Sequence, residues 1–380
     1  MVSVAMLVGI VAVAGFMSIR FAPGVSSPRV VLPSPVAVDF GPPPAGVQLL
    51  YVHDPNHPAW LIGYDWSGKA RGTVKFNVNN AAPAPDGQLF VVGGVGKGGG
   101  GSFFDRLGQS IPGPAAVTGY SPMWADDNRH KCDVSLDQLT FEWKFSTQLP
   151  GEAVKQVAVI AREPTAGGQT GISLASCSFG NDEAILVRTT VYWPSELWVV
   201  RISNGNVLFH NTYSNTAGLA NMIASRDSAF IAENSGKSIG QLQGSTSPST
   251  IIRRVSDRSV VATLDPTMAV LAFSGDDSLV LVNTSLWVGG QAIHLALIDL
   301  RSSQVLWRYD GPEGLGSYLA QPDGTAFAVA LKVVPLHPSP CGSTAQTACR
   351  AAPDDPLSDV QIVHGDGTTT AIPGRQVTTW

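Results

Sequence analysis

The sequence predicts an all-β repeat protein, on three observations. Charged residues make up only 14% of the 380 residues and apolar residues 44%, which disfavours long solvated helices. The 40 glycines and 27 prolines supply many turns but stay below the share typical of disordered chains. A turn followed by a short apolar strand recurs at intervals of 40 to 56 residues, the size of a propeller blade. We therefore expect a β-propeller of seven four-stranded blades, with six or eight as alternative counts, preceded by an N-terminal transmembrane helix.

The amino-terminal residues 1–20 predict a transmembrane anchor or a signal segment. Val2 to Ile19 is a run of 18 uncharged residues, and a helix of that length spans about 27 Å. An uncleaved anchor is the preferred interpretation, because the one Ala-x-Ala match, at Ala12 to Ala14, lies inside the apolar run and not after it. A cleaved signal peptide and a buried core helix remain the alternatives.

Residues 21–46 predict an extended spacer between the anchor and a folded domain at 47–380. Helix is excluded there by seven prolines, at positions 23, 28, 33, 35, 42, 43 and 44.

The repeat of residues 47–380 has two parts. The first is a turn containing Asp, Asn or Gly that leads into an apolar strand, here called the marker turn. The second is an alternating strand, a polar turn and another strand, seen most clearly from His294 to Tyr309. Val47 to Asp54 supplies the marker strand of an incomplete first unit. A β-sandwich is the alternative fold, and the fixed recurrence of both parts argues against it. The markers are Asp86, Asp126, Asp182, Asp227, Asp276 and Asp323.

A propeller also needs its first and last blades joined, since open sheet edges invite pairing with other chains. Arg375 to Trp380 alternates apolar positions and is a candidate closing strand. Arg29 to Phe40, from the amino-terminal side, is the alternative.

The strand starts Pro85-Asp86-Gly87 and Pro322-Asp323-Gly324 resemble those of TolB-type and WD-repeat-like bacterial β-propellers. The stretch from Leu297 to Tyr309 is similar to a blade of quinoprotein-like propellers. The resemblance covers residues 47 to 380 and implies the fold without assigning a subfamily. It implies no quinone cofactor, because the quinoprotein-like signature occurs convincingly only once.

The four cysteines predict one disulfide if the domain lies outside the cytoplasm. Cys341 and Cys349 enclose seven residues in a loop rich in Pro, Ser, Thr and Ala, and their pairing would pin that loop. Cys132 and Cys177 fall at unlike positions of successive repeats. We expect these two to be buried and unpaired, with a second disulfide as the alternative.

No catalytic, cofactor-binding or metal-binding residues are predicted. His53 and His57 are separated by a proline that prevents a helical metal site, and the acidic group from Asp126 to Asp133 alternates between strand faces. The glycine-rich stretch from Gly94 to Gly99 leads into no helix that could hold a phosphate.

The tryptophans are expected to pack between blades. Tyr192 and Trp193, in a predicted loop, form a candidate platform for a peptide or sugar.

These observations predict a membrane-anchored, extracytoplasmic propeller that acts as a binding or scaffold module for a protein, peptide or glycan. The domain itself is expected to be monomeric. Nucleic acid is excluded as a partner, because the net charge is −5 and no basic cluster with interleaved aromatic residues occurs. The alternative is a secreted propeller enzyme, a lyase or hydrolase, with a site at the central channel. Convergent His, Asp or Glu side chains in that channel would favour the enzyme, and an apolar or neutral channel would favour binding.

Overall fold

The computed structural model describes residues 39–54, 57, 59–76, 81–92, 101–116, 122–163, 171–188, 195–213, 219–235, 249–265, 267–283, 293–311, 314–332 and 360–373. Within these ranges the chain forms 26 β-strands and no helix. None of the described residues belongs to a helix able to span a membrane. The predicted anchor Val2–Ile19, the cysteines Cys341 and Cys349, and the pair Tyr192 and Trp193 lie outside the described residues.

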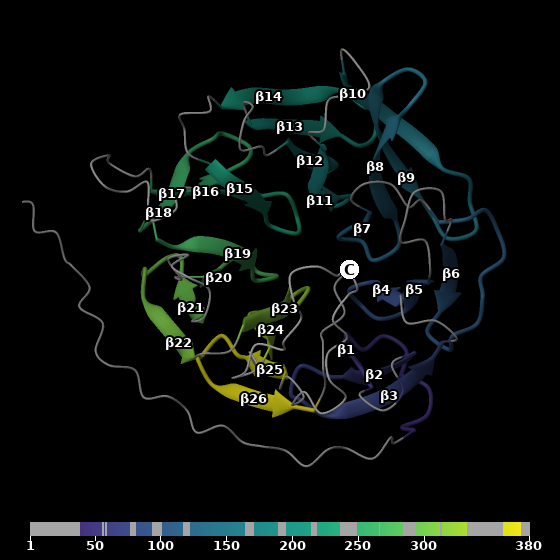
Figure 1. Cartoon of the computed structure of the whole chain (residues 1–380), viewed down its shortest axis with the longest axis vertical. Helices are drawn as coiled ribbons and strands as arrows, with labels where there is room; N and C mark the ends of the chain where they lie inside the picture. Colours follow the sequence, from purple (N-terminus) through teal and green to yellow (C-terminus); the bar gives the residue numbers. More distant parts are fainter. Residues whose placement is uncertain are drawn as a thin grey trace, which may run out of the picture.

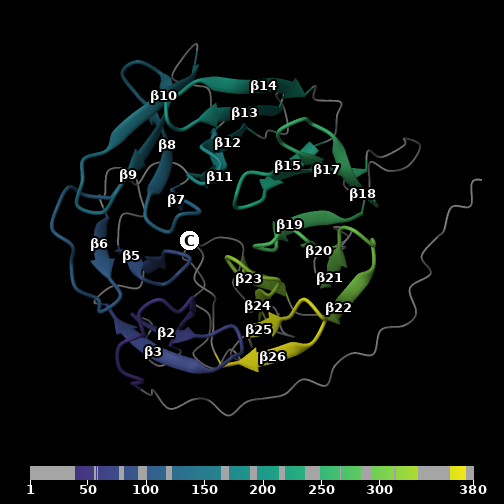
Figure 2. The same cartoon turned by 180° about the vertical axis from the view of Figure 1, so that it is seen from behind.

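The strands form seven antiparallel sheets arranged in a ring (Figures 1 and 2). The predicted seven-bladed propeller is confirmed. Five blades have four strands, and the first two have three strands each within the described residues. The first three blades are β1 (Leu50–His53), β2 (Trp60–Tyr64) and β3 (Ala70–Lys75); β4 (Ala81–Pro83), β5 (Leu89–Val92) and β6 (Ser102–Asp105); and β7 (Met123–Trp124), β8 (Lys131–Asp137), β9 (Glu142–Gln148) and β10 (Lys155–Arg162).

The other four blades follow in the same order, each with its first strand next to the central axis (Figure 1). They are β11 (Ser173–Ser178), β12 (Glu183–Arg188), β13 (Ser195–Arg201) and β14 (Val207–Tyr213); β15 (Leu219–Ala224), β16 (Phe230–Ser235), β17 (Thr250–Arg254) and β18 (Val260–Leu264); β19 (Ala269–Phe273), β20 (Leu279–Asn283), β21 (Ile293–Asp299) and β22 (Val305–Gly311); and β23 (Gly314–Ala320), β24 (Phe327–Lys332), β25 (Val360–Val363) and β26 (Thr369–Ile372).

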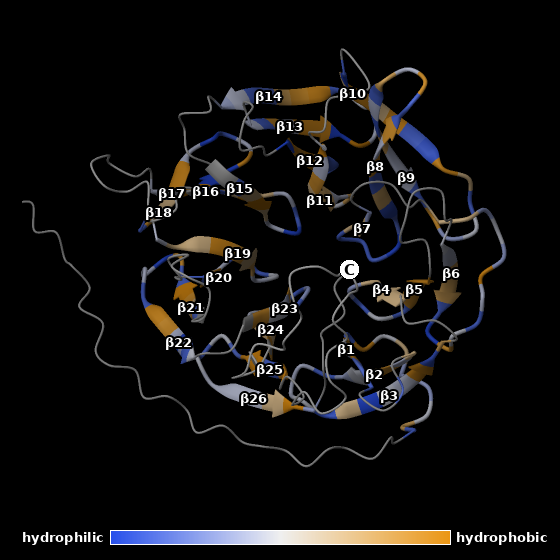
Figure 3. Cartoon of the chain, in the orientation of Figure 1, coloured by the Kyte–Doolittle hydropathy of each residue, from blue (hydrophilic) through white to orange (hydrophobic). Residues whose placement is uncertain are grey.

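Each seam between neighbouring blades has its own hydrophobic core. Alternation along a strand explains this, because successive side chains point to opposite faces of a sheet. In β12, Ala184 and Leu186 pack toward the third blade, whereas Ile185 and Val187 pack toward the fifth. The second strands β12 and β20 are therefore buried on both faces and read as nearly continuous apolar runs, whereas many turns between strands are hydrophilic (Figure 3). The expectation for the tryptophans holds for Trp66, Trp124, Trp143 and Trp198, all buried in seams.

The first and last blades meet through a seam of the same kind. Leu50, Val52 and Ile62 of the first blade pack against Ala328 and Ile362 of the last. Every blade is built from strands consecutive in the described chain. Packing therefore joins the two ends of the ring here, together with hydrogen bonds such as the one that the Tyr64 hydroxyl donates to the carbonyl of Pro373 (3.4 Å).

Of the two predicted closing strands, Arg375–Trp380 lies outside the described residues, and only the last two residues of Arg29–Phe40 lie within them. The Thr73 amide donates a hydrogen bond to the carbonyl of Gly41 (2.7 Å), and the Phe40 amide donates one to Thr73 Oγ1 (3.1 Å). The chain at Phe40 and Gly41 therefore runs along the outer edge of β3.

The marker turns join the first strand of a blade to the second and share one local geometry. In five of them the third residue has a positive φ: Gly87, Asn128, Asp182, Ser228 and Asp277. Glycine, asparagine and aspartate tolerate this conformation better than other residues do. This alignment corrects two predicted markers by one position, because Asp126 is the first residue of its turn and Asp182 the third.

The second residue of the marker turn is then Asp86, Asp127, Asn181, Asp227, Asp276 or Asp323. Its side chain closes the turn in four blades: the carboxylates of Asp86, Asp127, Asp227 and Asp276 each accept a hydrogen bond from the backbone N–H two residues later. The recurrence of aspartate in the sequence therefore has a local structural cause.

Candidate functional site

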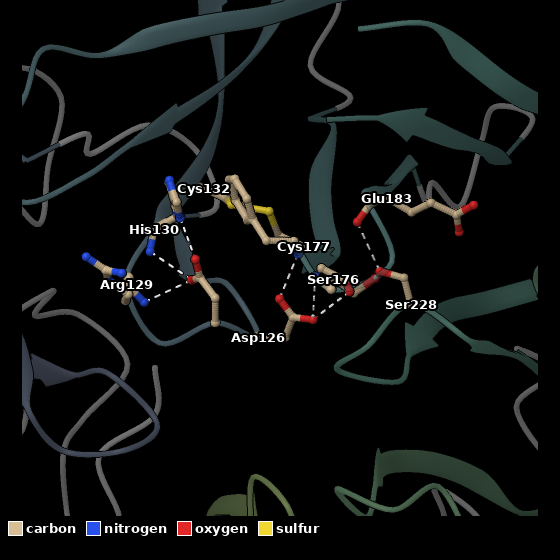
Figure 4. Close-up of a disulfide and its surroundings, with 12 residues drawn as sticks. Asp126, Arg129, His130, Cys132, Ser176, Cys177, Glu183 and Ser228 are labelled. Atoms are coloured by element: carbon tan, nitrogen blue, oxygen red, sulfur yellow. Dashed lines mark hydrogen bonds and ion pairs between the residues drawn. A yellow bond between two sulfur atoms is a disulfide. The ribbon is translucent and has the colours of Figure 1, made fainter. Parts of the chain in front are cut away.

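A disulfide joins the third and fourth blades where their inner strands meet (Figure 4). It links Cys132 of β8 to Cys177 of β11, with the two Cα atoms 6.6 Å apart. The expectation that these cysteines are unpaired is wrong. Cys132 is the second residue of β8 and lies just after a marker turn, whereas Cys177 is the last but one residue of β11 and lies just before one. Antiparallel strands place both positions at the same end of their blades, so the two sulfur atoms meet across the seam.

Next to the disulfide, the marker turn of the third blade is tied to that of the fourth (Figure 4). The Asp126 carboxylate accepts hydrogen bonds from Ser178 Oγ (2.6 Å), from the Phe179 amide (2.7 Å) and from the Gly180 amide (3.2 Å). Three donors on one carboxylate fix the relative position of the two turns. The Asn181 side-chain amide continues the chain of contacts by donating to the Asp227 carbonyl (2.6 Å) of the fifth blade.

Arg226 lies among the marker turns and links its own blade, the fifth, to two others. From the fifth blade, its Nη2 donates to the carbonyl of Asp126 (2.7 Å) and to Asn128 Oδ1 (2.6 Å) in the third blade. Its Nη1 lies 3.7 Å from Asp323 Oδ1 of the seventh blade. Burial lowers the pKa of the guanidinium, and the carboxylates of Asp323, Asp126, Asp86 and Asp127 oppose that shift. The side chain stays charged and draws together turns that are about 100 residues apart in sequence.

A pair of carboxyl groups joins the marker turns of the fifth and sixth blades. Burial, repulsion by Asp227 and a hydrogen bond to Asp227 raise the pKa of Asp277 to about 8. At neutral pH Asp277 is therefore largely protonated and can donate a hydrogen bond to Asp227 between the two turns.

This pair predicts a pH-dependent stability. The native state keeps a proton on Asp277 that the unfolded chain releases above its ordinary pKa of 3.8, so stability falls as pH rises from about 4 to about 8. Each pH unit costs at most about 1.4 kcal/mol, and partial exposure of the group reduces this. We expect Asp277→Asn to stabilise the protein at pH 8.5 by about 2 kcal/mol relative to wild type, with little change at pH 4.5.

Urea unfolding at both pH values measures this difference, and asparagine accepts the positive φ of 57° at position 277. Asp227→Asn should reduce the pH dependence less than Asp277→Asn, because burial is the larger cause of the shift. Equal pH dependence in wild type and Asp277→Asn would contradict the assignment.

A cavity of about 560 Å³ occupies the axis of the ring, among the first strands of five blades. Met123, Trp124, Leu271, Phe273 and Tyr318 supply its larger side chains, and alanines, glycines and serines line much of the rest. Among the described lining residues, Arg226 is the one that carries a charge. Such a volume suits a small ligand or a few side chains of a partner. The channel is therefore apolar in its interior and meets the marker turns at Arg226.

The histidines and the acidic group considered in the sequence analysis form no metal site within the described residues. His53 and Asp54 lie in and just after β1, and the described residues contain no group of three or more His, Cys, Asp or Glu side chains able to hold a metal ion. His130 pairs with Asp127 (2.5 Å) and stacks on Phe179 with the ring centroids 3.7 Å apart, so it supports its turn.

Sequence reasoning missed the role of Arg226, although one signal was present. The first residue of the marker turn is Pro85, Asp126, Gly180, Arg226, Gly275 or Pro322. Arg226 is the one basic residue at this position. A lone cation in a repeat whose neighbouring position is acidic marks a place where the turns converge.

No family model matches the sequence, and no curated protein matches it significantly. Among solved structures, 609 chains are similar to it. They include TolB from Acinetobacter baumannii, at 16% identity and a TM-score of 0.41, with 69% of this chain and 62% of TolB covered. The β-propeller domain of the Trilobed protease from Pyrococcus furiosus, described as having an open velcro topology, is 10% identical with a TM-score of 0.48, and 76% of this chain and 82% of that domain are covered.

Hydrazine synthase from Kuenenia stuttgartiensis is 16% identical with a TM-score of 0.41, and the match covers 69% of this chain and 66% of that one. TolB is thus among the structural neighbours, as the sequence resemblance predicted. Likeness at this level of identity concerns the fold and assigns no subfamily.

Proposed function

We propose that this propeller is an extracytoplasmic binding module that receives a peptide segment of a partner protein in its central cavity. The observation that carries the proposal is the cavity of about 560 Å³, lined by apolar and small side chains from five blades. Concave, mostly apolar sites with a few polar groups at their edge are typical of ligand-binding sites. A pocket built from several rigid strands also binds without large rearrangement, which favours affinity.

The extracytoplasmic location is supported by the Cys132–Cys177 disulfide, since structural disulfides persist in oxidising compartments. The 18-residue apolar run Val2–Ile19 supports a membrane anchor, and the proline-rich spacer after it would hold the propeller away from the bilayer. In this arrangement the cavity faces partners on the outer side of the membrane.

The cavity chemistry favours binding over the enzyme alternative. General acid–base catalysis needs side chains such as His, Asp or Glu aimed at the substrate. Among the described lining residues none of these types occurs, and Arg226 is engaged by backbone and amide oxygens. The aspartates that converge at the marker turns close those turns or lie near Arg226, and this structural use favours a binding module over a lyase or hydrolase.

The proposal predicts that filling the cavity abolishes binding. A library of random heptapeptides displayed on phage is selected against the intact chain, and the winning peptides are measured by fluorescence anisotropy. Ala272 lines the cavity, and we expect Ala272→Trp to weaken binding by more than about tenfold, because the indole takes the space of the ligand. Thermal melting shows whether each variant folds, and Ala224→Trp, at a second lining position, repeats the test.

Ala153→Trp, at an exposed position absent from the cavity lining, is the control and should leave affinity unchanged. A selection that yields no peptide, or peptides that bind the filled variants as tightly as wild type, would refute the proposed function.

A further inference from the structure

We propose that the ligand of the central cavity is a cationic, apolar peptide segment, whose apolar side chains enter the cavity while a lysine or arginine lies among the marker turns. The inference rests on the peptide-binding function proposed above and specifies its ligand. Two properties of the site carry it: the continuity of the cavity with the marker turns, and the sign of the charge that those turns hold.

One end of the cavity lies against the marker turns. Its lining includes Arg226, Gly275 and Pro322 of those turns, and Gln321, which directly precedes Pro322. We call this end the acidic mouth and define it by these four residues and the acidic side chains of the same turns. The lining on the interior side consists of strand residues such as Leu271, Phe273 and Leu319. A ligand seated in the cavity can therefore place a polar part at this mouth.

The acidic mouth carries an excess of negative charge. The charge of Arg226 interacts with the carboxylates of Asp86, Asp126, Asp127 and Asp323, which come from the second, third and seventh blades. Asp227 and Asp276 add two more in the fifth and sixth blades, next to Asp277. The basic side chains near these six carboxylates are fewer. They are Arg226, the exposed Arg129, and His130, which pairs with Asp127. A concave site walled by one sign of charge attracts ligands of the opposite sign.

Arg226 does not make the acidic mouth attractive to an anionic ligand. Its Nη2 already donates to two oxygens of the third blade, and its Nη1 faces Asp323. Any anionic ligand that approached Arg226 would also meet the carboxylates around it, and like charges at short range are unfavourable. A cationic group instead finds carboxylates with room for a further partner.

Asp323 is the carboxylate best placed for that contact. Its side chain is 71% exposed, whereas that of Arg226 is 20% exposed. Gln48 Nε2 donates to Asp323 Oδ2, and Arg226 lies near Asp323 Oδ1, so the carboxylate is oriented and still open to solvent. A carboxylate accepts several hydrogen bonds and can take a lysine or arginine in addition to these.

The composition of the selected peptides tests the charge directly. Heptapeptides selected by the intact chain, and displaced by filling the cavity, should contain lysine or arginine next to apolar residues and should be depleted of aspartate and glutamate. In a synthetic copy of a selected peptide, replacing the basic residue by norleucine should weaken binding by about tenfold, because norleucine keeps the apolar stem and loses the charge. Affinity should also fall as salt is raised from 50 mM to 500 mM.

Asp323→Lys should weaken the same peptide by about tenfold. Asp323→Asn, which removes one charge without adding another, should act in the same direction by less and serves if the lysine variant does not fold. Glu152→Lys is the matched control, because exposed Glu152 lies between the outer strands β9 and β10, and it should change affinity by less than about twofold.

The outcomes separate this inference from the function on which it rests. Acidic or uncharged peptides that depend on the cavity would overturn the cationic ligand and leave the binding function standing. Equal effects of Asp323→Lys and Glu152→Lys would also overturn it. Failure to select any cavity-dependent peptide would overturn the binding function itself, and the cationic ligand with it.

Discussion

Replacing Cys132 and Cys177 together by alanine is expected to lower the free energy of unfolding by about 4 kcal/mol. The disulfide closes a segment with a sequence separation of 45, and cross-linking so long a segment restricts the unfolded chain strongly. Both cysteines are also buried in the core of the seam between the third and fourth blades, so the truncation removes some packing. Guanidinium unfolding followed by tryptophan fluorescence measures the loss.

Mass spectrometry of alkylated protein provides the matching chemical test. In protein purified without reductant, Cys132 and Cys177 should resist alkylation until a reductant is added. The reduced wild type should then unfold near the midpoint of the alanine variant, since both lack the same cross-link. Alkylation of both thiols before reduction would contradict the disulfide. The argument from the disulfide for an extracytoplasmic location would then no longer hold.

Replacing Arg226 by glutamine is expected to cost about 3 kcal/mol of stability. Two charge-assisted hydrogen bonds would be lost or weakened, and the carbonyl of Asp126 would be left without its donor. The carboxylates of Asp86, Asp127 and Asp323 would also lose the cation that lies among them. Urea unfolding at pH 7 measures the change.

The conservative and control variants define what Arg226 contributes. Arg226→Lys should restore less than half of the loss, because an ammonium cannot reproduce the planar, multi-donor geometry of guanidinium. Arg254→Gln removes an exposed arginine that lies 3.5 Å from Asp257 and should cost under about 0.5 kcal/mol. If Arg226→Gln proved as mild as Arg254→Gln, Arg226 would not hold the marker turns together.

The blade architecture was predictable because its causes are local. Short apolar runs such as Glu183–Arg188 and Leu279–Asn283 predict strands that are buried on both faces. Aspartate and glycine in the marker turns identify the first hairpin of each blade. The offset of one residue at Asp126 and Asp182 arose because aspartate also occurs at the first and third turn positions, which spacing alone cannot distinguish.

The candidate site was less predictable because its members come from different blades. Arg226 reaches Asp126 across about 100 residues of sequence, and Cys132 meets Cys177 across 45. The sequence contained the relevant residue types, but its one indication of convergence was the lone arginine at the first turn position. The apolar lining of the cavity was also hidden, since residues such as Ala272 and Phe273 look like ordinary strand residues.

By itself, the amino-acid sequence determined the all-β class, the seven-part repeat and the apolar seams, since strand alternation and turn chemistry act over a few neighbouring residues. Only the tertiary structure decided that Cys132 pairs with Cys177 and that Arg226 is surrounded by carboxylates at the mouth of an apolar cavity. The physical reason is that these features depend on the ring. Closing it brings the inner ends of all the blades to a common axis, and contacts at that axis are set by the positions of whole blades.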